Sequence, residues 1–276
     1  MISIVVITYN NHHQLLKTIG SVENSSIYKG KKIPLEFVFI NGGNEEKSKL
    51  FLEEWKKNHP MDKVIQEKDF GISDAFNKGI NNSTGEYIQF LNSGDLWYEN
   101  DEYYLRAFTI FQQNEDYSFI HGDIIFNDSL VGEILLKPLM KSSLFQKHPL
   151  KFLGYGMPTH HQSMIVKKDA FKQTEYEKGK YFKLNYKLAM DYEWMIRFLQ
   201  CNNLGYYLPI VSVNMDGDGV SVNKEEESFF FCKKALKENN LYDFSNMLFF
   251  NLRFLKMKIR KLVYQLLPRD IIKKIK

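Results

Sequence analysis

The sequence predicts an α/β fold built around a mostly parallel sheet, and three observations predict it. Residues 2–8 form a nearly continuous β-branched run, which is typical of a buried strand. Residues 12–22 then place leucine, isoleucine and valine at helical spacing. A second strand and helix follow, and the alternation repeats up to residue 91. Strands and helices that alternate at this spacing form βαβ units with parallel strands.

The elements expected along the chain follow from this pattern. Within the alternating part we expect a strand at residues 35–40, a helix at about 45–57, a weaker strand at 63–67, a helix at 73–80 and a strand at 87–91. After Asp95 the alternation ends. There we expect a helix at 103–113, a strand at 118–126, a polar loop at 154–163, an amphipathic helix at 188–199 and a last strand at 206–213.

Composition narrows the class of protein. The 276 residues can bury a full core, and their apolar share is that of an ordinary globular protein. No run of 18 or more apolar residues occurs, and no basic segment followed by a long apolar core opens the chain. We therefore expect neither a membrane-spanning helix nor a signal peptide. Cys201 and Cys232 lack metal-ligand spacing and suit a reducing, cytoplasmic setting.

The net charge of +4 is unevenly distributed. Residues 253–276 carry nine Lys or Arg and one acid, Asp270, for a net charge of +8. The preceding 252 residues carry 28 basic and 32 acidic side chains, for a net charge of −4. A general nucleic-acid binder needs a basic surface on its body, so this asymmetry argues against one and favours an attachment segment.

The end of the strand at 87–91 is the most informative feature of the chain. Its apolar run stops at Asn92-Ser93-Gly94-Asp95, which places a lone carboxylate on a glycine-containing turn. In an open parallel α/β sheet, ligands bind at the C-terminal edge of the strands. We therefore predict a metal or phosphate site at Asp95. The alternative is that Asp95 caps a following helix.

Seven sequence blocks extend this prediction. They occur in the order SIVVITYN, FINGGN, DFGISDAFNKG, TGEYIQFLNSGD, THHQSMIV, AMDYEWMIRFL and GDGVS. Together they resemble glycosyltransferase family 2, and in particular the bacterial members that build capsule, O-antigen and exopolysaccharide chains. The resemblance implies a GT-A fold over residues 1–222, a Rossmann-like α/β architecture with a mostly parallel central sheet flanked by helices. Residues 223–276 lie outside it and are predicted to form a basic, amphipathic helical extension.

The resemblance also implies roles for single residues. Those implied to bind the nucleotide or donor sugar are Thr8, Tyr9, Asn10, Asn41, Asp69, Gly71, Asp74, Asn77, Ser93 and Gly94. Asp95 matches the end of the family's metal-binding element, which would hold Mg²⁺ or Mn²⁺ on the diphosphate, and Asp191 matches the general base. His161, Gln162, Glu193 and Ser221 are expected on the acceptor side, with Gly219 and Ser221 in one loop.

The chemistry of sugar transfer agrees with these roles. An oxygen-bound divalent cation would stabilise the departing nucleoside diphosphate, and a carboxylate would accept the proton of the attacking hydroxyl. One direct displacement inverts the anomeric carbon. Two departures from the family pattern stand out. Asn41 replaces an aspartate that contacts uracil, and Ser93-Gly94-Asp95 supplies a single carboxylate, so a cation would also need the diphosphate and water.

Other interpretations stay open for several of these residues. Asp191 and Glu193 could be first-turn acids that favour the helix dipole. His160 and His161 could form a metal pair, although a loop on the acceptor side fits better because adjacent histidines rarely point at one ion. Tyr9 could be packed instead of stacking on a base.

The C-terminal extension contains a basic amphipathic segment. Its aliphatic residues, Leu248, Leu252, Leu255, Ile259, Leu262 and Leu266, fall at steps of four and three, on one face of a helix. Such a helix, through residues 248–276, suits the anionic inner surface of a membrane and predicts a peripheral location. The alternatives are a helix packed on the body and a coiled-coil dimer seam.

The sequence thus predicts an inverting, metal-dependent hexosyltransferase. It would move a sugar from a nucleotide-sugar donor, UDP-linked, to a growing surface glycan on a lipid carrier. A non-catalytic partner of a membrane glycan-assembly complex is the main alternative. A glycoside hydrolase would also need paired carboxylates, but it would need neither a nucleotide nor a metal.

Overall fold

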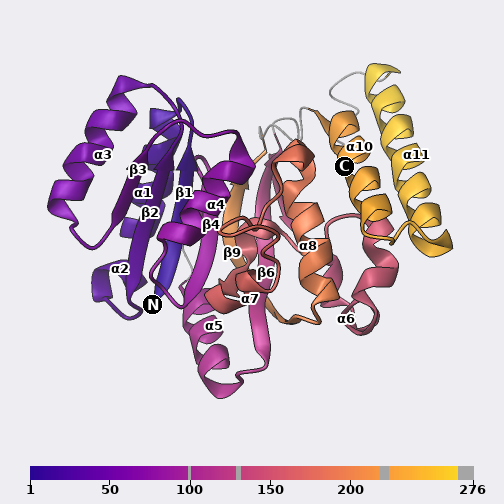
Figure 1. The fold of residues 1–276 in the computed structure, drawn as a ribbon, viewed down its shortest axis with the longest axis horizontal. Helices are drawn as coiled ribbons and strands as arrows, with labels where there is room; N and C mark the ends of the chain where they lie inside the picture. The colour runs from indigo at the N-terminus through magenta and orange to yellow at the C-terminus, as the bar shows by residue number, and fades with distance from the viewer. Residues whose placement is uncertain (99–100, 129–131, 218–223, 267–276) are drawn as a thin grey trace.

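The computed structural model describes residues 1–98, 101–128, 132–217 and 224–266. Within these residues nine strands form one sheet, in the order β3-β2-β1-β4-β8-β6-β9-β5, with β7 paired to β6. Helices cover both faces of the sheet (Figure 1). The predicted α/β architecture, a sheet flanked by helices and followed by a helical extension, is confirmed.

The N-terminal half of the sheet is parallel. It consists of β1 (Ile2–Thr8), β2 (Leu35–Asn41), β3 (Lys63–Gln66) and β4 (Tyr87–Asn92). Val5 of β1 pairs with Val38 of β2 and with Phe90 of β4, and all three side chains are buried. Parallel strands are covered on both faces, so they appear in the sequence as continuous apolar runs. This is why the expected strands agree closely with the observed ones.

The helices of this half divide between the two faces of the sheet. They are α1 (His12–Glu23), α2 (Ser26–Gly30), α3 (Glu46–Asn58), α4 (Ile72–Asn82) and α5 (Glu102–Gln113). Phe76 of α4 belongs to the same buried cluster as Val5. Leu15 of α1 and Trp55 of α3 pack with Phe39 in the cluster on the other face. The parallel strands therefore lie between two buried clusters, one on each face of the sheet.

The second half of the sheet mixes directions. It consists of β5 (Leu96–Trp97), β6 (Tyr117–Asp128), β7 (Gly132–Leu136), β8 (Ile165–Lys167) and β9 (Leu204–Asp216). β6 and β9 are parallel, whereas β8 is antiparallel to β4 and β6, β5 to β9, and β7 to β6. The sequence did not predict β5, β7 or β8, because β5 and β8 have two and three residues, too few to show a period, and β7 is mostly exposed.

Short helical segments occupy the region between β7 and α8 (Met190–Gln200). They are α6 (Ser143–Lys147), α7 (Lys168–Lys172) and the 3₁₀ segments Leu139–Lys141, Pro149–Tyr155, His161–Ser163 and Leu184–Ala189. The expected polar loop at 154–163 is therefore wrong in part, since two 3₁₀ segments enter it. The α-helix expected from residue 188 begins at Met190, just after Lys187 takes a positive φ of 42°.

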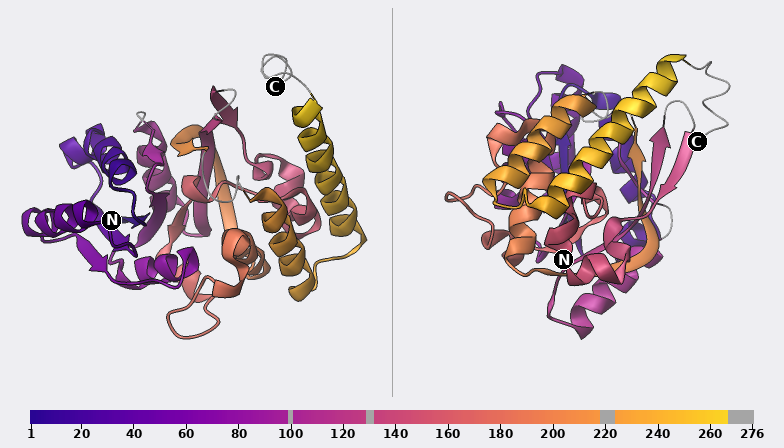
Figure 2. Two further views of the ribbon diagram at one scale, coloured as in Figure 1. Left: turned by 90° about the horizontal axis from the view of Figure 1, so that it is seen from above. Right: turned by 90° about the vertical axis from the view of Figure 1, so that its right-hand side faces the viewer.

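The C-terminal extension is helical where it is described. α10 (Glu225–Glu238) and α11 (Phe244–Leu266) lie at the opposite end of the molecule from α3 (Figures 1 and 2). Phe229 of α10 and Phe250 of α11 belong to the same buried cluster as Val5, so both helices share the core of the sheet. The expected boundary at residue 222 lies outside the described residues. None of the described helices has the length and apolarity needed to cross a membrane.

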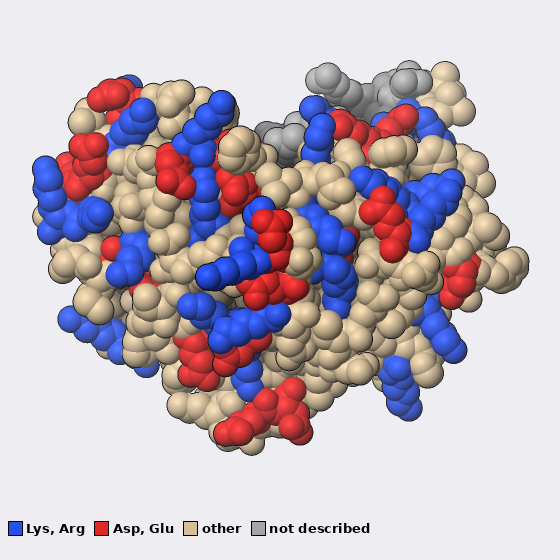
Figure 3. Space-filling model, viewed as in Figure 1, with Lys and Arg blue, Asp and Glu red and all other residues tan. Residues whose placement is uncertain are grey.

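Surface charge is mixed on the face shown in Figure 3. Lysine and arginine side chains alternate there with aspartate and glutamate over most of the described surface. A nucleic-acid binder concentrates its basic residues on one face or along one helix. This face of the body does not have that distribution.

Candidate active site

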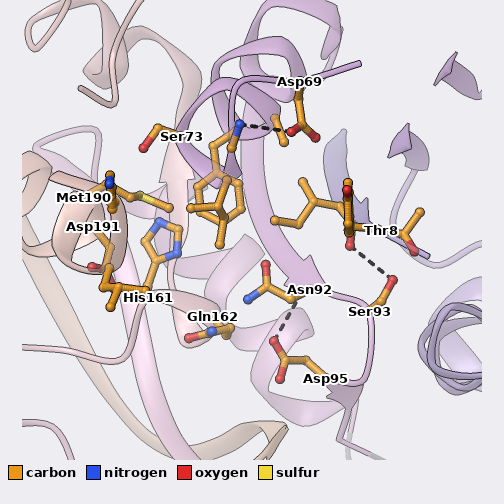
Figure 4. Close-up of a pocket in the computed structure, with 18 of the residues that line it drawn as sticks. Thr8, Asp69, Ser73, Asn92, Ser93, Asp95, His161, Gln162, Met190 and Asp191 are labelled. Carbon is orange, nitrogen blue, oxygen red and sulfur yellow. Dashed lines mark hydrogen bonds between the residues drawn. The ribbon is translucent and has the colours of Figure 1, made fainter. Parts of the chain in front are cut away.

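A pocket of about 790 Å³ opens at the C-terminal edge of the parallel strands. Thr8 ends β1 and Tyr9 follows it, Asp69 and Gly71 precede α4, and Asp95 follows β4. Figure 4 shows Asp191 and Met190 on one side and Asp95 and Ser93 on the other, with His161 and Gln162 between them. Pockets of this size at this edge of an α/β sheet take small ligands and cofactors.

The pocket is strongly acidic. The charged residues that line it are four aspartates, Asp69, Asp95, Asp191 and Asp216, and one lysine, Lys187. An anionic ligand such as a diphosphate would be repelled by this set, and a cation would reverse the balance. The set of aspartates therefore favours a cation over a free anion at this edge of the sheet.

Asp95 is held at the pocket by the turn after β4. Gly94 has a φ of 109°, a conformation that glycine adopts without a steric cost. The Asp95 carboxylate accepts hydrogen bonds from the backbone N–H of Asn92, at 3.3 Å, and of Asp216, at 3.2 Å. β5, and not a helix, follows at Leu96, so the alternative in which Asp95 caps a helix is wrong.

Asp216 is a site residue that the sequence analysis missed. It ends β9, which is separated in the sheet from β4, the strand that delivers Asp95, by β8 and β6, and its backbone N–H bonds to the Asp95 carboxylate. Gln14 Nε2 donates to Asp216 Oδ2 at 3.0 Å. Burial, with a contribution from the neighbouring Asp216, raises the pKa of Asp95 to about 7. The only signal in the sequence was an aspartate three residues after the last expected strand, at 206–213.

The carboxylates of Asp95 and Asp216 are ligands of the type that a divalent cation prefers, but two of them do not complete its coordination. Mg²⁺ and Mn²⁺ prefer carboxylate oxygens, and two adjacent acids hold a negative charge that a cation would neutralise. The described residues contain no cluster of three or more His, Cys, Asp or Glu side chains able to hold a metal alone. A cation held here would complete its coordination with ligand oxygens and water.

Asp191 enters the pocket from the first turn of α8. Its Oδ1 accepts a hydrogen bond from the Tyr192 backbone N–H at 2.8 Å. Burial raises the pKa of Asp191 above that of an ordinary aspartate. The strained Lys187 immediately precedes this turn and also lines the pocket, and such strain is concentrated at functional sites. Asp191 is therefore both a first-turn acid and a pocket carboxylate.

Glu193 does not reach the pocket. Its carboxylate is fully buried and accepts two hydrogen bonds from Arg197, each 2.9 Å long, and Lys183 Nζ lies 2.8 Å away. It was expected on the acceptor side, and that placement is corrected by the structure. The reason is helical spacing, because residues i and i+2 of a helix point in different directions and Glu193 meets Arg197 at i+4.

The residues implied to bind the nucleotide divide into two groups. Thr8, Tyr9, Asp69, Gly71 and Ser93 line the pocket. The other five, Asn10, Asn41, Asp74, Asn77 and Gly94, are not among the residues that line it. The sequence pattern did not distinguish residues that touch a ligand from residues that shape the loops around it.

Hydrogen bonds explain the second group. Asn10 Oδ1 accepts from the backbone N–H of Asn44 at 2.7 Å and of Glu45 at 3.0 Å. Asn77 Oδ1 accepts from the N–H of Tyr181 at 2.9 Å and of Phe182 at 2.8 Å. These amides fasten two loops that border the pocket.

Asn41 and Asp74 also bond within the protein. Asn41 Nδ2 donates to Gln66 Oε1 at 3.1 Å, and its Oδ1 accepts from the Gly43 N–H at 3.1 Å. Asp74 lies 3.1 Å from Lys78 Nζ. Asn41 thus stabilises the turn after β2 and does not present its amide to the pocket.

His161, which was expected on the acceptor side, lies deep in the wall of the pocket. His161 is buried and stacks with Phe76 and Phe90, and burial lowers its pKa to about 3. Burial also lowers the pKa of His160 to about 4. His161 and Gln162 both line the pocket, and His160 does not. Ser221 and Gly219 lie outside the described residues.

Comparison with known proteins adds the family. A putative glycosyltransferase named EpsH from Bacillus subtilis is 30% identical over 36% of this chain and 27% of its own length. The minor teichoic acid biosynthesis protein GgaB of B. subtilis is 27% identical over 64% of this chain, which spans only 19% of GgaB. An uncharacterized glycosyltransferase of Methanocaldococcus jannaschii is 23% identical over 94% of this chain and 87% of its own length.

Solved structures agree on the fold. Residues 1–349 of Staphylococcus aureus TarS, in complex with UDP-GlcNAc, align with a TM-score of 0.59 and 17% identity over 86% of this chain and 66% of that chain. The mannosyltransferase PcManGT of Pyrobaculum calidifontis, in complex with GDP-Man and Mn²⁺, aligns with a TM-score of 0.58 and 13% identity over 98% of this chain and 77% of that chain. These likenesses confirm the expected GT-A fold. The sequence model of glycosyl transferase family 2 matches residues 3–174, and the chain belongs to that family.

Proposed function

We propose that this protein transfers a hexose from a nucleotide-sugar donor to a growing surface glycan, with inversion at the anomeric carbon and with a divalent cation. The observation that carries the proposal is the distribution of acids in the pocket. Asp95 and Asp216 form one acidic pair, Asp191 stands on another side, and a single lysine accompanies them. Transfer from a nucleotide sugar needs a cation that stabilises the departing diphosphate and a base that accepts the hydroxyl proton. The pocket has carboxylates for both roles.

The cation would be held by Asp95 and Asp216 together with the donor diphosphate. When bound, it supplies positive charge to the departing nucleoside diphosphate. Asp216 compensates for the single carboxylate in Ser93-Gly94-Asp95. Thr8, Tyr9 and Ser93 lie around the same edge and would contact the nucleotide.

Asp191 is the proposed general base. The acceptor hydroxyl oxygen attacks the anomeric carbon, the bond from that carbon to the diphosphate oxygen breaks, and the hydroxyl proton passes to the Asp191 carboxylate. A carboxylate whose pKa is raised by burial accepts a proton more readily than an ordinary aspartate. Direct attack from the face opposite the leaving group inverts the configuration.

The donor is proposed to be UDP-linked. A uridine donor is bound by TarS in its complex, whereas PcManGT binds GDP-Man. Asn41 bonds within the protein, so the choice of base falls to residues that line the pocket, among them Tyr9 and Asp69. The lipid-linked acceptor and the role in surface-polysaccharide synthesis are inferred from the family to which the chain belongs.

Calorimetric titration tests the donor and the metal together. UDP, CDP, GDP and TDP are titrated into the wild type with and without Mn²⁺ or Mg²⁺, and then into Asp95→Ala and Asp216→Ala. We expect UDP to bind only with metal, and the apparent affinity to fall at least about tenfold in both variants. Asp169→Ala, which removes an exposed carboxylate from α7, is the matched control and should bind like the wild type.

Three results would contradict parts of the proposal. Tight binding of another nucleotide would replace UDP as the donor class. Equal nucleotide binding with and without metal would show that the site does not need a cation to bind the nucleotide. Absence of nucleotide binding would favour a non-catalytic partner of a glycan-assembly complex, and unchanged biological activity of Asp191→Asn would support the same reading.

A further inference from the structure

We propose that the outward face of α11 binds the surface of a membrane that contains anionic lipids. The face consists of Leu248, Leu252, Leu255, Ile259, Leu262 and Leu266, which we call the aliphatic face. Their exposed fractions range from 41% to 72%, although aliphatic side chains of this size are usually buried. Steps of four and three residues keep them on one side of a helix with about 3.6 residues per turn.

The opposite side of α11 is fixed to the body. Phe250 and Met257 are 4% and 2% exposed. Asn246 Nδ2 donates to the Leu150 carbonyl at 2.8 Å, and Asn246 Oδ1 accepts from the Gly154 N–H at 2.8 Å. These contacts set the rotation of the helix. The helix therefore cannot roll inwards to bury the aliphatic face without losing them.

α11 is positively charged along its length. It contains five basic residues and no acidic ones, namely Arg253, Lys256, Lys258, Arg260 and Lys261. Two carboxylates of α10 offset part of this charge, because Glu226 pairs with Lys258 and Lys261 and Glu225 pairs with Arg260. Arg253 lies over the buried Phe229 ring, 4.4 Å from its centroid, on the side of the body. The other four positive charges and the two negative ones leave a net positive surface beside the aliphatic face.

The basic residues flank the aliphatic face on both sides. At about 100° per residue, Lys256 lies on one flank and Lys258 on the other. Arg260 and Lys261 lie further round the helix, where they pair with Glu225 and Glu226 of α10. Long lysine and arginine stems can lie along apolar surface while their charged groups reach lipid phosphates. An apolar stripe between two basic rows suits a helix that lies in the headgroup region of an anionic bilayer.

The same charges argue against a second copy of this chain as the occupant. A coiled-coil seam is favoured by opposite charges on its flanks, and here both flanks are basic. Two aliphatic faces in contact would place these rows against each other. The membrane surface is the occupant that matches both the apolar face and its positive flanks.

Vesicle flotation tests the proposal with the full chain. The probes are vesicles of phosphatidylcholine alone and of phosphatidylcholine mixed with phosphatidylglycerol. We expect the wild type to float with the mixed vesicles and to be released by high salt. The double variant Leu255→Asp/Ile259→Asp should lose at least about tenfold in bound fraction, and Lys256→Glu should lose less. Leu50→Asp is the matched control, because Leu50 is 55% exposed like Leu255 but lies on α3 at the other end of the molecule.

Several outcomes would overturn the proposal. One is a wild type that fails to float, and another is a double variant that floats like the wild type. A wild type that is dimeric by light scattering and becomes monomeric in the double variant, with no flotation in either, would assign the face to a second copy. Circular dichroism confirms folding, and Lys256→Glu keeps the test valid if the double variant unfolds. The vesicles contain no glycan, so the result is independent of the proposed sugar transfer.

Discussion

The first turn of α8 places two carboxylates in opposite environments. Asp191 faces the pocket, and burial raises its pKa. Glu193, two residues later, is fully buried but bonded to Arg197 and close to Lys183. Glu193 thus has two cationic partners, whereas Asp191 accepts its hydrogen bond from a backbone N–H. The partner of a carboxylate, more than its depth, separates a structural acid from a candidate base.

The largest expected effect is on catalysis by Asp191→Asn. The amide keeps the shape of the side chain but cannot accept the proton of the acceptor hydroxyl. We expect the rate of sugar transfer to fall by about 10² to 10⁴-fold, measured with the donor identified by titration. Nucleotide affinity should stay near the wild-type value, and the variant should remain folded. Transfer at the wild-type rate by a folded Asp191→Asn protein would remove Asp191 from the mechanism.

The next largest effect is on stability and comes from changing Glu193 instead of Asp191. Glu193→Gln removes the negative charge of the carboxylate that pairs with Arg197 and Lys183, so these two cations lose their buried partner. We expect the free energy of unfolding to fall by about 3 kcal/mol, measured by urea denaturation. The remaining folded fraction should bind nucleotide normally. A stable Glu193→Gln protein with impaired transfer would instead return Glu193 to the acceptor side.

The smallest effect is on the pH dependence of stability, and it tests whether Asp191 is desolvated by burial. The pKa of Asp191 is raised in the folded state, so folding favours its protonated form. As pH rises above the unfolded value of about 4, the wild type should lose stability relative to Asp191→Asn, by about 1.4 kcal/mol for each unit of the raised pKa. Asp95 is present in both proteins and cancels from the difference. A difference that does not change with pH would show that Asp191 is not desolvated.

Much of the parallel half was predictable because its signals are local. β1 and β4 are buried on both faces, so their apolar runs and the polar turn at Asp95 could be read directly from neighbouring residues. β5 and β8 could not be predicted, since two or three residues pair only when distant strands are already in place.

The site divides in the same way. Asp95 and Asp191 were named from their sequence context, and both line the pocket. Asp216 was missed because its role depends on β9 bringing it beside Asp95, 121 residues away in the chain. Asn41 and Asn77 were named as ligand contacts, yet their amides hold backbone groups of the surrounding loops.

The sequence by itself determined the α/β class, the family, the carboxylate at the end of β4 and the amphipathic period of α11. Each of these is written in adjacent residues or in a short repeat, so no distant contact is needed to see it. Only the tertiary structure decided that Asp216 joins Asp95, that Glu193 turns towards Arg197, and that α11 is fixed with its aliphatic face outwards. Those outcomes depend on which residues pack or carry charge beside them, and partners far apart in the chain are specified only when it folds.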